Sequence, residues 1–255
     1  MRRFARGYWE GRTSWFEIGQ DGNGRMLAGE PGSETLAGSS MLGEGELGHI
    51  RYLAPCTPEK VIGLAYNFKS LVGPRARYDE PLFFLKSPTS LCGQASAIPY
   101  PDYARKVWVE VELGVVIKKA CSKVSVEEAG DYILGYTIGS DVTAENICGR
   151  DWHLARSKAL DGFAPAGPYL TMDIETGDLE LTTHINGKEF QRGRTSDRIV
   201  NDREAVSLIS RFVTLKAGDL ILTGTPAGAL DSIVKPGDVV THRIEDLGEL
   251  SFTFI

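Results

Sequence analysis

The most restrictive feature of the sequence is a run of alternating residues between positions 107 and 117. Every odd position from Val107 to Ile117 is apolar, and Glu110 and Glu112 lie among the even positions. Because neighbouring side chains in a β-strand point to opposite faces, this alternation predicts one strand with a fully apolar face. The opposite face would then carry the two carboxylates side by side.

A third carboxylate closes the next expected strand, Tyr136 to Asp141. Three acidic groups that converge at strand ends repel one another unless a cation lies between them. Carboxylate oxygens suit a hard divalent cation such as Mg²⁺, which also keeps positions free for a substrate. The alternative is that Glu110 and Glu112 form the solvated face of an amphipathic strand, where charged residues usually lie.

The rest of the chain predicts many short strands and few helices. Asn186-Gly187 separates two strand-like runs and is a strong hairpin signal. Residues 203–213 have apolar positions at helical spacing behind Asn201 or Asp202 as the N-cap. This pattern predicts a β-rich α+β fold with a rolled or sandwiched mixed sheet.

Two parts are expected along the chain. Residues 1–50 are rich in glycine and turn signals and predict a small N-terminal β lobe, whereas residues 51–255 are expected to form the main domain, which carries the three carboxylates. Within the second part, the polar stretch 67–80 follows an apolar strand and is expected to be a lid over the site. His49 is expected to have a structural or surface role.

Composition restricts the partners. The net charge of −6 and the lack of any Lys/Arg run argue against a nucleic-acid partner. No apolar stretch approaches the roughly 20 residues that span a bilayer, and no apolar region follows the basic N-terminus as in a secretory signal. The four cysteines are scattered without zinc-type spacing, so reduced thiols in a cytoplasmic protein are expected.

Six motifs, in this order, resemble the fumarylacetoacetate hydrolase family over roughly residues 50 to 255. They are Tyr66-Asn67-Phe68, Pro81 to Pro88, Glu110 to Leu113, Gly135 to Ala144, Lys158 to Pro168 and Thr223 to Gly228. The resemblance implies the C-terminal-domain fold of that family and a homodimer. It also implies a Mg²⁺ or Mn²⁺ ion held by Glu110, Glu112 and Asp141, with a 2-oxo acid as the small-molecule substrate.

The resemblance further implies roles for individual side chains. Lys158 matches a lysine beside the metal, expected to stabilise negative charge or hold a water, although an exposed helix lysine is the alternative. Thr225, with Gly224 before it, matches the turn that receives the substrate carboxylate, where backbone N–H groups approach an anion. Tyr66, Asn67, Gln191 and Thr195 are further substrate-contact predictions, and Asp161 is expected to be a structural partner of Lys158.

Departures from the family pattern bear on the reaction. Leu71 stands where hydrolytic members carry a lid histidine, the glutamate of that pair is missing, and Glu145 replaces an arginine. Without a general base, water activation loses on the order of 10²–10⁴ in rate, which disfavours C–C hydrolysis. Lys69 or His153 could donate a proton instead, with a structural histidine as the alternative for His153. The Asn-Phe-Lys-Ser segment is similar to the lid of the decarboxylase half of two-part isomerase/decarboxylases.

The sequence therefore predicts a metal-dependent decarboxylase or isomerase that acts through an enolate. The expected substrates are 2-oxo or 2-hydroxy-dienoic di- and tricarboxylates from the catabolism of aromatic compounds. Two alternatives stay open: an acylpyruvate- or fumarylpyruvate-type hydrolase with another base, and a catalytically quiet protein that binds metal and a keto acid.

Overall fold

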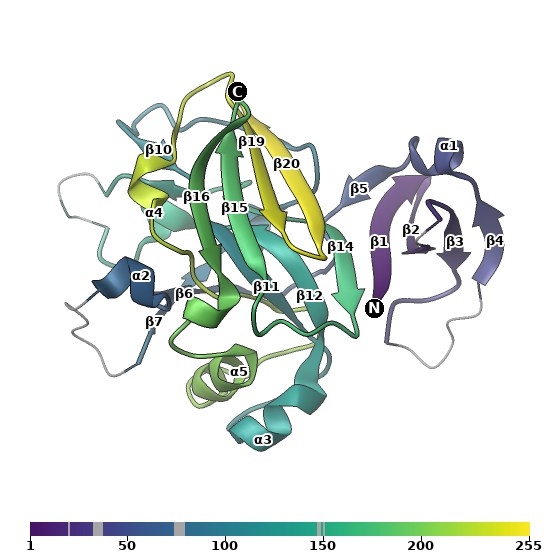
Figure 1. Ribbon diagram of the computed structural model, residues 1–255, viewed down its shortest axis with the longest axis horizontal. Coiled ribbons are helices and arrows are strands. Elements are labelled where there is room, and N and C mark those ends of the chain that lie inside the picture. Colours follow the sequence, from purple (N-terminus) through teal and green to yellow (C-terminus); the bar gives the residue numbers. More distant parts are fainter. Residues whose placement is uncertain (20, 33–37, 74–79, 147–148, 150) are drawn as a thin grey trace.

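The computed structural model describes all residues except 20, 33–37, 74–79, 147–148 and 150 (Figure 1). The described strands are β1 (Arg2–Trp9), β2 (Arg12–Ile18), β3 (Gly24–Leu27), β4 (Gly38–Leu42), β5 (Arg51–Leu53), β6 (Val61–Ala65), β7 (Leu82–Lys86), β8 (Leu91–Cys92), β9 (Ala97–Ile98), β10 (Val107–Trp108), β11 (Val111–Ile117), β12 (Ile133–Ser140), β13 (Thr143–Ala144), β14 (Ala164–Met172), β15 (Glu180–Ile185), β16 (Lys188–Arg194), β17 (Leu220–Leu222), β18 (Ile233–Val234), β19 (Val239–Ile244) and β20 (Gly248–Phe254). The α-helices are α1 (Glu44–Leu47), α2 (Lys69–Val72), α3 (Val126–Ala129), α4 (Ala155–Lys158) and α5 (Asp202–Ser210).

Two large sheets and one small sheet build the molecule. The main sheet runs in the order β4-β3-β2-β1-β14-β12-β11-β17-β6-β7, and a second sheet runs β16-β15-β19-β20-β9. Apolar side chains of the second sheet, such as Leu181 and Phe252, share one buried cluster with Leu113 and Ile138 of the main sheet. The predicted β-rich α+β fold with a sandwiched mixed sheet is therefore confirmed.

Helix α5 forms where the sequence predicts it. The Asn201 side chain accepts hydrogen bonds from the backbone of Arg203 and Glu204, and the Glu204 side chain accepts one from the Asn201 backbone. This reciprocal cap satisfies N–H groups that the first helical turn leaves without partners. The helix buries Val206 and Ile209 in a cluster with strands β6, β11 and β17, and it lies beside α3 in Figure 1.

The predicted hairpin at Asn186-Gly187 is also confirmed. Asn186 and Gly187 have φ angles of +50° and +81°, which match the left-handed conformation that a two-residue hairpin turn requires. Strands β15 and β16 pair on either side of that turn, and β19 pairs with β20 to close the chain. These four strands stand in front of β11 and β12 in Figure 1.

The alternating stretch 107–117 is not one strand, and that prediction was wrong. Strand β10 pairs with β13 and β18, whereas β11 belongs to the main sheet. Between them, Val109 donates a backbone hydrogen bond to Ser232 at 3.2 Å, and the Glu110 carbonyl accepts one from Asp141 at 3.0 Å. The apolar face continues across the break, because all six odd positions from Val107 to Ile117 are buried.

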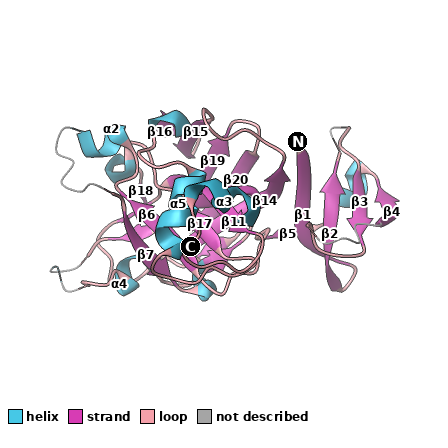
Figure 2. Ribbon diagram, turned by 90° about the horizontal axis from the view of Figure 1, so that it is seen from below, coloured by secondary structure: helices cyan, strands magenta, loops and turns pink. Residues whose placement is uncertain are grey.

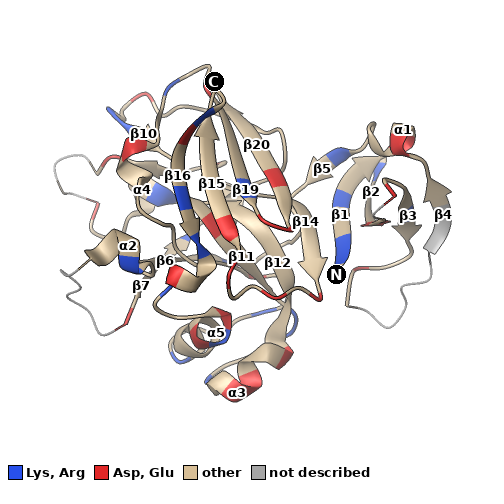
Figure 3. Ribbon diagram, in the orientation of Figure 1, with Lys and Arg blue, Asp and Glu red and all other residues tan. Residues whose placement is uncertain are grey.

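The N-terminal strands lie at one end of the molecule, on the far side from α2 (Figures 1 and 2). Strand β1 pairs antiparallel with β14, with Arg2 opposite Met172 and Ala5 opposite Tyr169, so the sheet of the lobe continues the main sheet. Acidic and basic residues are interspersed over both parts (Figure 3). A division into domains near residue 50 stays a prediction.

Two compositional expectations can be compared with the structure. Cys56, Cys92 and Cys121 are free thiols, and Cys148 lies outside the described residues. Within the described ranges, the helices are too short and too polar for any of them to cross a membrane.

Candidate metal centre and substrate cavity

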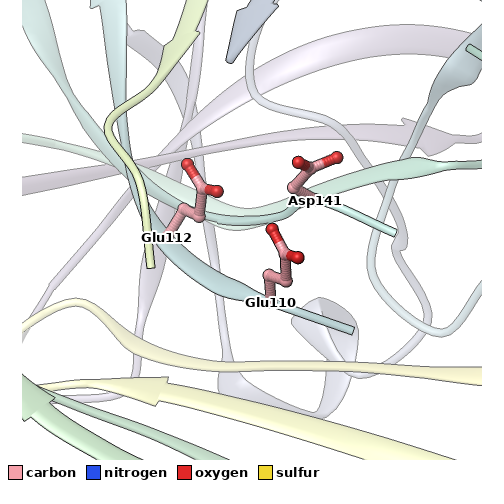
Figure 4. A group of neighbouring side chains, drawn as sticks. All are labelled: Glu110, Glu112 and Asp141. Atoms are coloured by element: carbon pink, nitrogen blue, oxygen red, sulfur yellow. The ribbon is translucent and has the colours of Figure 1, made fainter. Parts of the chain in front are cut away.

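Three carboxylates meet where strand β12 ends beside the start of β11. One carboxylate oxygen from each of Glu110, Glu112 and Asp141 lies within 4.8 Å of the other two. Figure 4 shows the three side chains turned toward a common space. Glu112 and Asp141 are each only 1 % exposed, so water screens their charges poorly.

Strand register brings these groups together. Val111 pairs with Ser140 and Glu112 with Gly139 along the antiparallel β11–β12 pair. Asp141, the next residue after β12, therefore falls opposite Glu110, and its N–H donates to the Glu110 carbonyl. A slip of one residue would turn Glu112 toward the opposite face of the sheet and break up the group.

Two lysines lie against the carboxylates. The ammonium groups of Lys86 and Lys158 both contact the Asp141 carboxylate, and Lys158 Nζ is also 3.6 Å from Glu110 Oε2. Lys158 further donates to Thr143 Oγ1 at 2.9 Å and lies 4.5 Å from the centre of the Phe84 ring. Three carboxylates against two ammonium groups leave an excess of one negative charge.

The pKa values follow this charge balance. Burial raises the pKa of Glu110, and it raises the pKa of Glu112 well above its ordinary value, with the negative charge of Asp141 adding to both shifts. Burial alone would also raise the pKa of Asp141, but Lys158 and Lys86 lower it instead. Two buried carboxyl groups that resist ionisation, next to a third that is ionised, fit a site completed by a divalent cation. The donors are all oxygens, as Mg²⁺ and Mn²⁺ prefer.

The turn at Gly224 lies directly against the carboxylates. Gly224 N donates to Glu112 Oε2 at 2.5 Å. Its φ of +90° favours glycine, and a Cβ there would come within 3.0 Å of the Asn67 Cβ. Thr225, the next residue, lines the cavity beside the three carboxylates.

Asn67 and Gln191, both predicted to contact the substrate, are buried behind the cavity wall. The Asn67 amide donates to the Thr223 carbonyl at 2.8 Å, and its oxygen accepts from Val200 N at 2.9 Å. Gln191 Nε2 donates to Thr225 Oγ1 at 3.0 Å, and Gln191 Oε1 accepts from Val111 N at 3.3 Å. Neither lines the cavity, and hydrogen bonds to Thr223, Val200, Thr225 and Val111 occupy their amides.

A buried histidine that sequence reasoning missed extends this network. His242 Nε2 is 2.9 Å from Ser140 Oγ, and its Nδ1 is 3.0 Å from Thr183 Oγ1, which donates to Gln191 at 2.7 Å. The chain of hydrogen bonds thus connects the residue before Asp141 with Thr225. The sequence carried one signal of it, since His242 alternates with the apolar Val240 and Ile244 on the inward face of β19.

We expect His242 to make the folded protein sensitive to acid. Burial lowers the pKa of His242 to about 3, and the neighbouring His184 adds to this shift. In the unfolded chain the imidazole has an ordinary pKa of about 6.5. The contribution of the neutral His242 imidazole to the free energy of unfolding is thus fully present above pH 6.5. It is lost as pH falls toward 3, by about 1.4 kcal/mol per pH unit. His242→Gln should reduce the slope of the unfolding free energy against pH by nearly the amount expected for one proton. The slope is measured by urea unfolding at several pH values.

The exposed His49 provides the control for this prediction. His49→Gln should leave the slope of stability against pH between 6.5 and 4 unchanged. An equally steep slope in His242→Gln would show that other groups cause the acid sensitivity.

A cavity of about 980 Å³ opens above the three carboxylates. Of the residues predicted for catalysis or substrate contact, Tyr66, His153, Lys158 and Thr225 line it, together with the three predicted metal ligands. Lys69 does not line it and is exposed at the start of α2. The lid prediction covered residues 67–80, of which 74–79 lie outside the described residues.

Two weaker sequence predictions are placed away from the cavity. Thr195 is buried, where its hydroxyl accepts from Leu179 N at 2.8 Å and donates to the Thr176 carbonyl at 2.7 Å. Asp161 is exposed, and Lys158 pairs with Asp141 and Glu110 instead. Conversely, Lys86, which lies within the Pro81 to Pro88 motif, is buried against Asp141.

Comparison with known proteins gives a consistent result. Residues 60–255 match the family model described as fumarylacetoacetate (FAA) hydrolase C-terminal. The structure is similar to a 2-hydroxyhepta-2,4-diene-1,7-dioate isomerase from Mycobacterium marinum, with a TM-score of 0.89, 33% identity and coverage of 100% of this chain and 98% of the other. The mitochondrial oxaloacetate tautomerase fahd2 of Xenopus laevis is 33% identical over 80% of this chain and 68% of its own.

A third comparison concerns the metal. A fumarylpyruvate hydrolase from Pseudomonas aeruginosa, solved in complex with Mn²⁺ and pyruvate, is similar with a TM-score of 0.70 and 27% identity, over 77% of this chain and 89% of the other. Three observations point to the same family. They are the similarity to this fold, the converging carboxylates of the present chain and the family match over residues 60–255. This chain is a member of the fumarylacetoacetate hydrolase family.

Proposed function

We propose that the protein is a divalent-metal-dependent enzyme that interconverts keto and enol forms of 2-oxo acids, or decarboxylates them, through an enolate. The observation that carries this proposal is the group Glu110, Glu112 and Asp141 with Lys158 at the base of a large cavity. Related proteins named as an isomerase and a tautomerase support it. The proposed ion is Mg²⁺ or Mn²⁺, held by these three carboxylates.

When bound, the ion supplies a Lewis acid that lowers the cost of negative charge on the carboxylate and 2-oxo oxygens of the substrate. The negative charge of Asp141 raises the pKa of Lys158 against the opposing effect of burial, so this lysine keeps its proton at neutral pH. Lys158 then acts as a fixed positive charge for the enolate rather than as a base. The fixed charge requires no reorganisation during the reaction.

Proton transfer at carbon requires a second group. His153 lines the cavity and is exposed, and its ring nitrogens can accept or donate a proton. We therefore assign proton transfer to His153, in place of Lys69, which does not reach the cavity. Thr225 and the turn before it are assigned to the substrate carboxylate, with Gln191 and Asn67 holding that turn in place and Tyr66 on the adjacent wall.

Hydrolysis is the second candidate function, favoured by the similarity to a fumarylpyruvate hydrolase. It needs an activated water, and Leu71 lines the cavity where hydrolytic members of the family carry a histidine. We therefore rank it below keto–enol chemistry.

We expect Leu71→His to gain little hydrolase activity, with less than about tenfold change in acetylpyruvate cleavage. An imidazole without the carboxylate that orients it is a weak base, and such pairs act as a unit. The measurement is the release of acetate followed by proton NMR, with Leu71→Asn as the control for lost apolar contact. A gain of 10²-fold or more would mean that the rest of the hydrolytic site is already present.

The remaining parts of the proposal concern the setting of the enzyme. We propose a cytoplasmic homodimer that acts in the breakdown of aromatic compounds, on the basis of the family membership and the free cysteines. Analytical ultracentrifugation would test the dimer directly.

Proton NMR of two substrates tests the reaction. Oxaloacetate and acetylpyruvate are incubated with the protein, with and without Mg²⁺, in deuterated buffer. Metal-dependent exchange of the C3 protons, or loss of carbon dioxide from oxaloacetate, without acetylpyruvate cleavage is the expected result. Cleavage to acetate and pyruvate would favour the hydrolase, and no metal-dependent reaction with either compound would contradict the proposal.

A further inference from the structure

The cavity has two chemically different ends. At its base lie the three carboxylates, Lys158 and Thr225. Toward solvent, its lining is formed by large apolar side chains from four separate segments: Leu71 of α2, Leu82 and Leu85 of β7, Trp152 before α4, and Leu230 of the short helix Ala229–Asp231. Segments far apart in the sequence thus place the same kind of side chain at the mouth.

These side chains are exposed although they are apolar. Trp152 is 85 % exposed and Leu230 71 %, and Leu71, Leu82 and Leu85 are each more than a third exposed. With Tyr66, six of the fourteen exposed large apolar residues of the described chain line this one cavity. Exposed apolar surface gathered at a cavity marks a binding site more often than scattered single residues do.

Positive charge is scarce in the same lining. Among the described residues that line the cavity, Lys158 is the only lysine or arginine. Its ammonium group already contacts Asp141, Glu110 and Thr143. Apart from the imidazole of His153, the described lining therefore offers no uncommitted cation to a second carboxylate that enters the apolar mouth. Desolvating an unpaired carboxylate is costly, whereas burying a hydrocarbon group is favourable.

We propose that the substrate is a 2-oxo acid whose far end is an apolar tail, aliphatic or aromatic, rather than a second carboxylate. This inference rests on the proposed function, since it takes the 2-oxo acid end to lie at the three carboxylates. For substrates long enough to reach the mouth, it narrows the di- and tricarboxylates expected from the sequence to those with one acid end. The apolar mouth selects them by contact area, and each added methylene should raise the binding affinity about two- to fourfold.

The test uses N-alkyl oxamates, which present the same carboxylate and carbonyl as a 2-oxo acid but cannot enolise. Binding to the Mn²⁺-loaded protein is measured by calorimetry for the ethyl, butyl and hexyl compounds. A further pair, N-(4-methylpentyl)oxamate and N-(3-carboxypropyl)oxamate, differs only in an isopropyl against a carboxylate end. We expect Kd to fall with each added methylene and the isopropyl compound to bind at least about tenfold more tightly.

A charge placed in the mouth should reverse the preference. Leu230→Lys is expected to weaken the binding of hexyl oxamate and to tighten the binding of the carboxypropyl compound. The ratio of the two Kd values should change at least about tenfold. Met41→Lys is the matched control, because Met41 is 70 % exposed but lies in β4 at the far end of the molecule. It should leave both Kd values unchanged.

The outcomes separate this inference from the proposed function. Equal Kd values along the alkyl series, or tighter binding of the carboxypropyl compound, would overturn the apolar-tail assignment even if oxaloacetate and acetylpyruvate react. Graded oxamate binding without any metal-dependent reaction would support the assignment and contradict the proposed reaction.

Discussion

Glu112→Gln is expected to lower metal-dependent kcat/KM by at least about 10³-fold, because Lewis-acid stabilisation is worth several kcal/mol and each 1.4 kcal/mol is a factor of ten. The glutamine keeps the size of the side chain and an oxygen for the Gly224 N–H, so the turn should persist. Without metal, the variant should be more stable than the wild type at pH 8. Burial raises the pKa of Glu112 above that of a glutamate in the unfolded chain. The folded protein therefore loses stability as pH rises above the pKa of the unfolded glutamate, because the buried side chain resists ionisation.

The metal response provides the second measurement. Saturation at about 100 times Kd should stabilise the wild type by about 2.7 kcal/mol, which raises Tm by roughly 5–10 °C in a chain of this size. Glu112→Gln should show almost no metal-dependent rise. Glu249→Gln, an exposed residue paired with Arg243 on the surface, should behave as the wild type in both assays. A full Tm response to Mg²⁺ in Glu112→Gln would remove the carboxylate site from the mechanism.

Lys158→Met is expected to lower kcat by about 10²–10³-fold while leaving Mg²⁺ affinity equal or tighter. Removing a fixed charge that stabilises a developing anion costs this much in other enzymes. Metal affinity should not fall, because the substitution makes the surroundings of the three carboxylates more negative. Without metal, the variant should unfold at a lower temperature than the wild type, since Asp141 and Glu110 lose a cation.

Lys119 offers a matched control for this change. Its ammonium group lies 4.7 Å from the centre of the Tyr132 ring, much as Lys158 lies over Phe84, but Lys119 follows the opposite end of β11 from Glu110 and Glu112. Lys119→Met should keep kcat within about twofold of the wild type. Weaker Mg²⁺ binding in Lys158→Met together with unchanged kcat at saturating metal would indicate that this lysine organises the site and does not stabilise the anion.

The sequence predicted what depends on local periodicity. Period-two alternation placed Glu110 and Glu112 on one face, and the chemistry of carboxylates then implied a cation with Asp141. The positions of Lys86 and His242 depend instead on pairing across the sheets, 55 residues from Lys86 to Asp141 and 102 from His242 to Ser140. No local pattern encodes such distant partners. The same limit explains the break at Val109, where the chain passes from one sheet to another.

Substrate contacts were harder to predict than metal ligands for a related reason. Asn67 follows Tyr66 and Gln191 binds Thr225, both of which line the cavity, but whether an amide faces the ligand or the groups behind it depends on the turn that it supports. Apolar residues such as Leu82 and Trp152 give no chemical signal in the sequence. Only their joint exposure at one cavity distinguishes them from core residues.

The pairing of β1 with β14 has a consequence for how this chain avoids aggregation. Strand β12, which leads to Asp141, has β14 as its neighbour, and β1 covers the backbone groups on the other side of β14 from Tyr169 to Met172. An uncovered strand there would be a flat template for the backbone of another molecule. The N-terminal lobe thus protects this side of the main sheet from pairing with another molecule, and its four antiparallel strands move the open edge on this side away from the three carboxylates.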